Sequence, residues 1–165
     1  MHAETLSSWL NDFSDLHARA KQGTLTAAQR TEYVRAREEL AEALLLSQKT
    51  GSHPEAGMRR SLRVAQALPV ELEMPRGRTT AITLDLSSGG FSTLLSEAPE
   101  VGTCMGFKLR LGRGLAPVTG KVRLVNSVPQ NGSVRVGFRF DELPNEDRER
   151  VDFVVVDAVL KQFGR

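Results

Sequence analysis

The chain has 165 residues, which is enough for one domain with an appendage and for a sizeable hydrophobic core. Its 22 Lys and Arg residues nearly balance its 20 Asp and Glu residues, and the net charge of +2 argues against a broad nucleic-acid-binding surface. The single cysteine, Cys104, excludes an internal disulfide, and the spacing of the three histidines does not suit a zinc site. The sequence has no apolar run of membrane length and no signal-peptide pattern, which predicts a cytoplasmic protein without a membrane span.

The first fifty residues are predicted to form a helical hairpin. Apolar residues recur at intervals of three and four over residues 5–22, and again from Thr26 to about Gln48. Gly23 ends the first helix, and Thr26 with Gln29 forms a capping box for the second. The apolar stripes consist of Leu6, Trp9, Leu10, Phe13, Leu16 and Ala20 in the first helix and Tyr33, Ala36, Leu40, Ala43 and Leu44 in the second.

Two helices of this length must bury their stripes against something. The alternatives are the remainder of the same chain, a second copy of the hairpin, or another protein. Trp9, Phe13, Leu16 and Tyr33 are interpreted either as ordinary hairpin core or as an interaction surface. We therefore expect residues 1–50 to form a hairpin unit and the Gly- and Pro-containing residues 51–57 to form a linker.

From residue 58 to the end, the pattern predicts a separate domain that is mainly β. The hydrophobic period changes to two, which is typical of half-buried strands. A Pro-Arg-Gly turn at residues 75–77 and an Asn-Gly turn at residues 131–132 separate pairs of strands. Six short alternating strands favour an antiparallel barrel. Four strands are marked by alternating apolar rows and two by continuous segments: Val70, Leu72 and Met74; Ile82, Leu84 and Leu86; the segment Phe91 to Leu95; Met105, Phe107, Leu109 and Leu111; the segment Val118 to Val128; and Val134, Val136, Phe138 and Phe140.

A last helix is predicted to begin near Asn145, which can cap it, with Glu146 and Asp147 in its first turn. The β-branched run at residues 153–156 leaves a strand as the alternative.

Polar residues gather at the end of the strand that contains Leu84 and Leu86. Asp85 and Ser87 have the opposite parity, so we expect them to share an exposed face as a carboxylate beside a hydroxyl. The Gly89-Gly90 step that follows allows positive φ and close approach to a ligand. Arg59 and Arg63, four residues apart before the first strand, provide guanidinium groups suited to phosphates and to the O6 and N7 atoms of guanine.

These residues resemble the pattern of the PilZ domain family, R-x-x-x-R followed by [DN]-x-S-x-x-G. Here the pattern is Arg59-x-x-x-Arg63 and Asp85-x-Ser87-x-x-Gly90, with every motif position matched, and the resemblance covers about residues 58–160. It implies a six-stranded antiparallel barrel with a C-terminal helix that binds the bacterial second messenger cyclic di-GMP. It leaves the N-terminal hairpin unexplained.

The chemistry of these side chains suits that ligand. Arg can pair with a phosphate or a Hoogsteen edge and stack on a base, and Asp85 can accept from guanine N–H groups. Arg60 either adds a phosphate contact or is a solvated charge. The expected ligand-binding residues are Arg59, Arg60, Arg63, Asp85, Ser87, Gly89 and Gly90. The structural alternative is that Asp85 and Ser87 only organise the turn before the glycines.

Enzymatic functions find no support in the sequence. Residues 114–121 differ from a phosphate-binding loop in spacing and have Val122 where a Ser or Thr is needed, and no histidine in the barrel region could activate Ser87 or Ser88. We therefore predict a non-enzymatic cyclic di-GMP receptor, without catalytic residues, metal or cofactor, that couples binding to a change of conformation or partner. The alternatives are an adaptor that no longer binds nucleotide and uses the hairpin as its contact surface, and a DNA-binding protein, which is disfavoured because the basic residues of the hairpin lie beside acidic ones.

Overall fold

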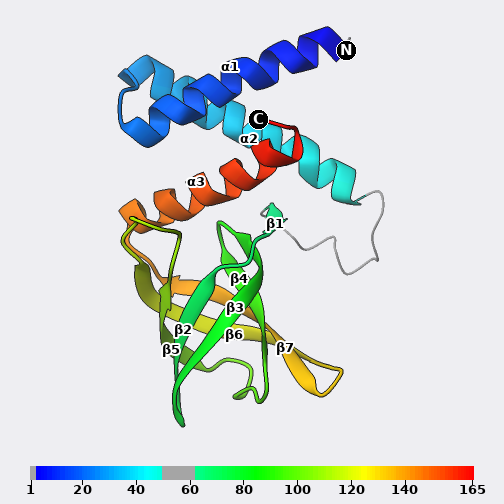
Figure 1. Cartoon of the computed structure of the whole chain (residues 1–165), viewed down its shortest axis with the longest axis vertical. Coiled ribbons are helices and arrows are strands. Elements are labelled where there is room, and N and C mark those ends of the chain that lie inside the picture. The colour runs from blue at the N-terminus through cyan, green and yellow to red at the C-terminus, as the bar shows by residue number, and fades with distance from the viewer. Residues whose placement is uncertain (1–2, 50–61) are drawn as a thin grey trace. The chain divides into compact units, whose positions relative to one another are not determined.

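A computed structural model describes residues 3–49 and 62–165 of the chain (Figure 1). The chain divides into two compact units, one made of residues up to 62 together with residues 159–165, the other of residues 63–158. The predicted linker, residues 51–57, lies outside the described residues, so the domain boundaries placed there stay predictions. No helix in residues 3–49 or 62–165 has the length and apolar character needed to cross a membrane.

The first unit contains the predicted helical hairpin. Helix α1 spans Ala3–Gln22 and helix α2 spans Ala27–Lys49, and the two helices run antiparallel from a tight turn (Figure 1). Gly23 has a φ of 72°, a left-handed conformation that favours glycine at a helix end. The capping box is confirmed, since the Gln29 backbone N–H donates to Thr26 Oγ1 and the Thr26 backbone N–H donates to Gln29 Oε1.

An aromatic cluster forms the core of this hairpin. Phe13 and Tyr33 are buried and stack with ring centroids 5.8 Å apart, and the Tyr33 hydroxyl lies 2.8 Å from Nδ1 of the buried His17. The interpretation of Phe13 and Tyr33 as hairpin core is therefore confirmed. Leu6, which the periodicity placed in the same stripe, is 47% exposed, so the packed seam begins after it.

The second unit is an antiparallel barrel, as predicted. Strands β2 to β7 close in the order β2-β3-β4-β7-β6-β5 and back to β2, and the short β1 pairs with β3 beside the barrel (Figure 1). The strands span Arg63–Ala65 (β1), Pro69–Met74 (β2), Gly77–Ser87 (β3), Gly90–Leu95 (β4), Cys104–Leu109 (β5), Val118–Gln130 (β6) and Ser133–Glu142 (β7). Arg63 thus lies within a short strand, one that the sequence did not predict.

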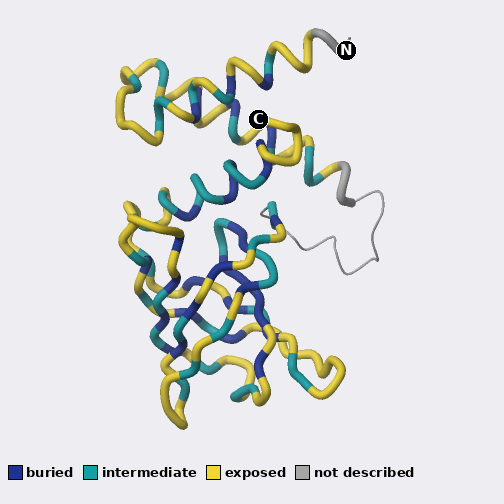
Figure 2. Tube along the Cα trace, in the orientation of Figure 1, coloured by how far each residue is buried: buried dark blue, intermediate teal, exposed yellow. Residues whose placement is uncertain are grey.

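Inward-pointing apolar residues fill the barrel, and the buried stretches of its strands are dark blue in Figure 2. Phe91, Phe107, Phe138 and Phe140 lie together, with the rings of Phe91 and Phe138 centred 5.2 Å apart. The predicted turn at Asn131 and Gly132 joins β6 to β7, and both residues have positive φ, as a two-residue hairpin turn requires.

One predicted inward row is wrong at its start. Ile82 is 53% exposed and Thr83 is buried, the reverse of the expected alternation, whereas Leu86 is buried as expected. A β-bulge between Thr83 and Asp85 inserts one residue into β3 and exchanges the two faces of the strand. The buried Thr83 hydroxyl is satisfied, because Oγ1 accepts from the Leu68 N–H at 2.9 Å and donates to the Gln66 carbonyl.

The C-terminal segment is helical, so the strand alternative for residues 153–156 is wrong. Helix α3 spans Asn145–Gln162, with Glu146 and Asp147 in its first turn. Within the barrel unit, Val151 is fully buried and Arg150 donates to the Ala116 carbonyl of the β5–β6 connection. Within the helical unit, Arg165 Nη2 donates to Ser7 Oγ at 2.8 Å, which ties the chain end to α1.

Candidate functional site

The strand register gathers the predicted site residues on one outward face of the barrel. Arg63 of β1 pairs with Ser87 of β3, and Ser87 pairs with Gly90 of β4. Paired residues and every second residue along a strand point to the same face, so Asp85 belongs to this face as well. Arg59 and Arg60 lie outside the described residues, and their part in the site stays a prediction.

Asp85 is held between two guanidinium groups. Its Oδ1 accepts from Arg63 Nη1 at 3.2 Å, and its Oδ2 accepts from Arg135 Nη2 at 3.2 Å. The Asp85 side chain is 17% exposed, whereas that of Arg135 is 46% exposed. Both carboxylate oxygens therefore have a cationic partner, and one of these partners comes from β7.

Ser87 is not exposed, contrary to the expectation for this strand end. It is 2% exposed, and its hydroxyl oxygen accepts from the Gly89 N–H at 3.2 Å and donates to the Gly90 carbonyl at 3.3 Å. The hydroxyl thus organises the turn between β3 and β4, as the structural alternative for this residue described.

Position 90 requires glycine because the backbone of the neighbouring strand lies too close for a side chain, and not because of a positive φ. Neither Gly89 nor Gly90 is among the glycines with positive φ, which corrects one reason for expecting glycine here. A Cβ atom on Gly90 would lie 1.9 Å from the backbone oxygen of Phe138 in β7. This contact is too short for any side chain, so the close pairing of β4 with β7 requires glycine.

Four further residues of this face, on β4 and β7, were not predicted as site residues from the sequence. Ser92 of β4 pairs with Asp85 on one side and with Gly137 of β7 on the other, and Leu94 pairs with Arg135. The Ser92 side chain is buried, and its hydroxyl has no hydrogen-bond partner among the residues that the structure describes. Alternation along β7 places Arg135 outward, but only the pairing between strands distant in sequence shows that it reaches Asp85.

A second ion pair lies farther across the same face. Arg139 pairs with Gly90 on one side and with Arg123 of β6 on the other. Arg123 Nη2 donates to Asp141 Oδ2 at 3.1 Å, and its Nη1 donates to the Gly102 carbonyl. Together the four arginines Arg63, Arg123, Arg135 and Arg139 and the carboxylates Asp85 and Asp141 carry a net charge of +2, which suits a dianionic ligand.

The Arg123 to Asp141 pair gives a test in acid. The hydrogen bond from Arg123, followed by that from the Cys104 thiol, holds the pKa of Asp141 below its usual value. A lowered pKa stabilises the folded protein above the ordinary aspartate pKa, and this contribution is lost as the pH falls through the folded-state value. We expect the difference in unfolding free energy between the parent and Asp141→Asn to shrink below about pH 4. Urea unfolding of both proteins from neutral to acidic pH measures this difference in unfolding free energy. A difference that does not change with pH would contradict a stabilising ion pair between Arg123 and Asp141.

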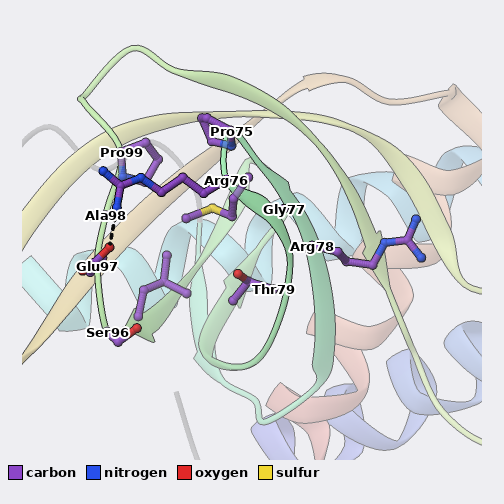
Figure 3. A pocket seen from close by; sticks show the side chains of 11 residues that line it. Pro75, Arg76, Gly77, Arg78, Thr79, Ser96, Glu97, Ala98 and Pro99 are labelled. Atoms are coloured by element: carbon purple, nitrogen blue, oxygen red, sulfur yellow. Dashed lines mark ion pairs between the residues drawn. The ribbon is translucent and has the colours of Figure 1, made fainter.

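Two hollows of the barrel unit lie elsewhere. One, of about 390 Å³, is lined by the β2–β3 turn and the segment after β4, where Arg76 Nη1 and Glu97 Oε2 form an ion pair at 3.5 Å (Figure 3). The other, of about 270 Å³, lies over Gly106 and Gly120 among charged residues that include Glu71 and Lys108. Neither of these two hollows is lined by Arg63, Asp85 or Arg135.

Comparison with known proteins identifies a family. The sequence profile of the PilZ domain matches residues 58–155, which is more than half of the chain. No curated protein sequence matches the chain.

Solved structures show the same fold. The PilZ domain with c-di-GMP of YcgR from Escherichia coli superposes with a TM-score of 0.53 and 16% identity, over 64% of this chain and 94% of that one. The K. pneumonia MrkH–c-di-GMP complex gives a TM-score of 0.56 and 14% identity over 63% and 53% of the two chains. The Bacillus subtilis inhibitor of motility (MotI/DgrA) gives 0.55 and 13% over 66% and 52%. This chain therefore spans about half the length of two of the three.

Proposed function

The chain belongs to the PilZ family, whose domains are non-enzymatic receptors for cyclic di-GMP, and on this basis we propose that it binds cyclic di-GMP on the Asp85 face of the barrel. The observation that supports the proposal is the arrangement of Arg63, Asp85 and Arg135, because guanidinium groups flank a carboxylate on a face of net positive charge. Two solved relatives of this fold, YcgR and MrkH, are named as complexes with c-di-GMP.

In this proposal the ligand contacts both the arginine side chains and the carboxylate of Asp85. Arg63 binds a phosphate or the O6 and N7 atoms of a guanine as a planar fork. Asp85 accepts from the guanine N–H groups, which no cation can do. Arg59 and Arg60 add phosphate contacts. Gly89, which is partly exposed, offers its backbone to the ligand, whereas the buried Gly90 keeps β4 close to β7. Ser87 holds the turn that positions these groups.

A competition experiment tests this assignment. Unlabelled cyclic di-GMP should displace a fluorescent cyclic di-GMP from the full chain, whereas GMP and the linear dinucleotide should displace it far more weakly. Equal displacement by GMP would mean that the face recognises guanine or phosphate alone.

The proposal includes an output through the N-terminal hairpin. Binding changes the conformation or the partner of the protein, in the cytoplasm where an intracellular messenger reaches it. The hairpin is the proposed contact surface for a second copy or for another protein, because Leu6 and Leu46 are 47% and 60% exposed near the end of the hairpin that lies away from its turn. If the face does not bind nucleotide, an adaptor that uses this surface is the second candidate.

Self-association through the hairpin has a direct test. Replacing Leu6 and Leu46 by glutamate should lower the sedimentation mass of the full chain to that of a monomer, because each change puts a charge into an apolar contact. Leu115→Glu is the matched control, since Leu115 is 56% exposed but belongs to the barrel unit. A parent that already sediments as a monomer would exclude self-association.

A further inference from the structure

We propose that the nucleotide surface extends across β4 onto β7, where Arg135 contacts a ligand phosphate and Ser92 forms a hydrogen bond with the ligand. This inference rests on the proposed function, and it adds two contact residues outside the R-x-x-x-R and D-x-S-x-x-G patterns. It starts from two independent observations, the shared carboxylate of Asp85 and the unpartnered hydroxyl of Ser92.

A guanine that approaches Asp85 meets two guanidinium groups that already contact its oxygens. In the free protein Arg63 occupies Oδ1 and Arg135 occupies Oδ2, each at 3.2 Å. A guanine presents two N–H groups on one edge, and a carboxylate that accepts both uses both of its oxygens. Each oxygen has a second lone pair, so the guanine competes with the two guanidinium groups for space at this carboxylate rather than for its last acceptor sites.

Arg135 is the partner that can leave most readily. Its side chain is 46% exposed, against 33% for Arg63, and it reaches Asp85 across β4, whereas Arg63 lies on the strand next to Asp85. Once displaced, its guanidinium group needs a new acceptor, and the ligand brings two phosphates to the same face. A charge-assisted hydrogen bond from Arg135 to a phosphate replaces the one lost to Asp85.

Ser92 lies on β4 at the point where the ion pair between Arg135 and Asp85 crosses that strand. The register sets Ser92 between Asp85 and Gly137, and Arg135 lies two residues before Gly137 on the same face of β7. Gly137 has no side chain, and the atom nearest to a Cβ placed there would be Asn126 Oδ1, at 3.6 Å. A buried hydroxyl without a partner costs free energy. A ligand that opens the ion pair can supply the missing partner from its guanine edge.

A double-mutant cycle separates direct contact from positioning of Asp85. We expect Arg135→Ala to weaken cyclic di-GMP binding by about tenfold both in the parent and in an Asp85→Asn background. If Arg135 acted only by holding Asp85, it would have no effect once Asp85 is replaced, and that result would overturn the contact. Arg110→Ala is the matched control, because Arg110 pairs with Glu71 on another part of the barrel and should bind as the parent does.

Ser92→Ala makes the second half of the test. It should bind cyclic di-GMP several-fold more weakly while its unfolding midpoint stays at or above that of the parent, because it removes a hydroxyl that has no partner in residues 3–49 and 62–165. Parental affinity in Ser92→Ala would overturn the Ser92 contact. Titration of the parent comes first: a parent that does not bind cyclic di-GMP refutes the proposed function itself, whereas a binding parent with unaffected variants refutes only this extension.

Discussion

Replacing Gly90 by alanine is expected to destabilise the barrel by about 3 kcal/mol, at the upper end of the usual cost of overpacking. The new Cβ would lie 1.9 Å from the Phe138 oxygen and 3.0 Å from the Arg139 Cα, and both are backbone atoms that cannot move aside as a side chain can. Strands β4 and β7 would have to separate where the site is formed. The melting temperature should fall by on the order of 10 °C.

Gly137→Ala is the matched control for this variant. Gly137 lies in the neighbouring row of the same two strands, but the nearest atom to its added Cβ would be Asn126 Oδ1, at 3.6 Å, an ordinary contact. Its stability should change by less than about 1 kcal/mol. If Gly90→Ala melts with the parent and loses only ligand binding, then the glycine serves the ligand and not the fold.

Arg63→Ala is expected to weaken cyclic di-GMP binding by about one to two orders of magnitude. The variant loses a charge-assisted contact and leaves ligand groups unpaired, a cost of roughly 1.5–3 kcal/mol. Its stability should change little, because partly exposed ion pairs such as that with Asp85 contribute up to about 1 kcal/mol. Calorimetric titration of the variant beside the parent, together with a thermal melt of each, measures both quantities.

The control is Arg76→Ala, which removes the same charge from the barrel unit far from the proposed contacts. Arg76 forms an exposed ion pair with Glu97 at the hollow in Figure 3. If both variants lose affinity equally, the effect is one of overall charge. If neither loses affinity, Arg63 is not a ligand contact.

The architecture was predictable because each element has a local signal. Helix periodicity, the capping box of Thr26 and Gln29, and the Asn131-Gly132 turn all depend on residues close in sequence, and the structure confirms them. The final helix was harder to predict, since its β-branched residues also suit a strand. Its buried face, which includes Val151, Val155 and Val159, decides for the helix.

The faces of β3 could not be predicted from alternation. No residue type in the sequence marks the bulge, which places one extra residue of β3 opposite β4. As a result Thr83 points inward and Ile82 points outward. The reversal ends before Leu86, so the motif after the bulge keeps its predicted sides except that Ser87 is covered.

The site was predictable only where a contiguous motif marks it. Arg63, Asp85, Ser87 and Gly90 were found from their spacing, and the structure brings them together. Arg135 is fifty residues away from Asp85 in the chain, and its side chain reaches Asp85 across β4. Such a pairing follows from the register of a closed barrel, which no local pattern shows.

Calorimetric titration of the full chain with cyclic di-GMP tests the central claim most directly. The account predicts saturable binding of micromolar or tighter affinity, which Arg63→Ala weakens and Arg76→Ala leaves unchanged. The absence of binding heat, with no rise in melting temperature at saturating cyclic di-GMP, would contradict it.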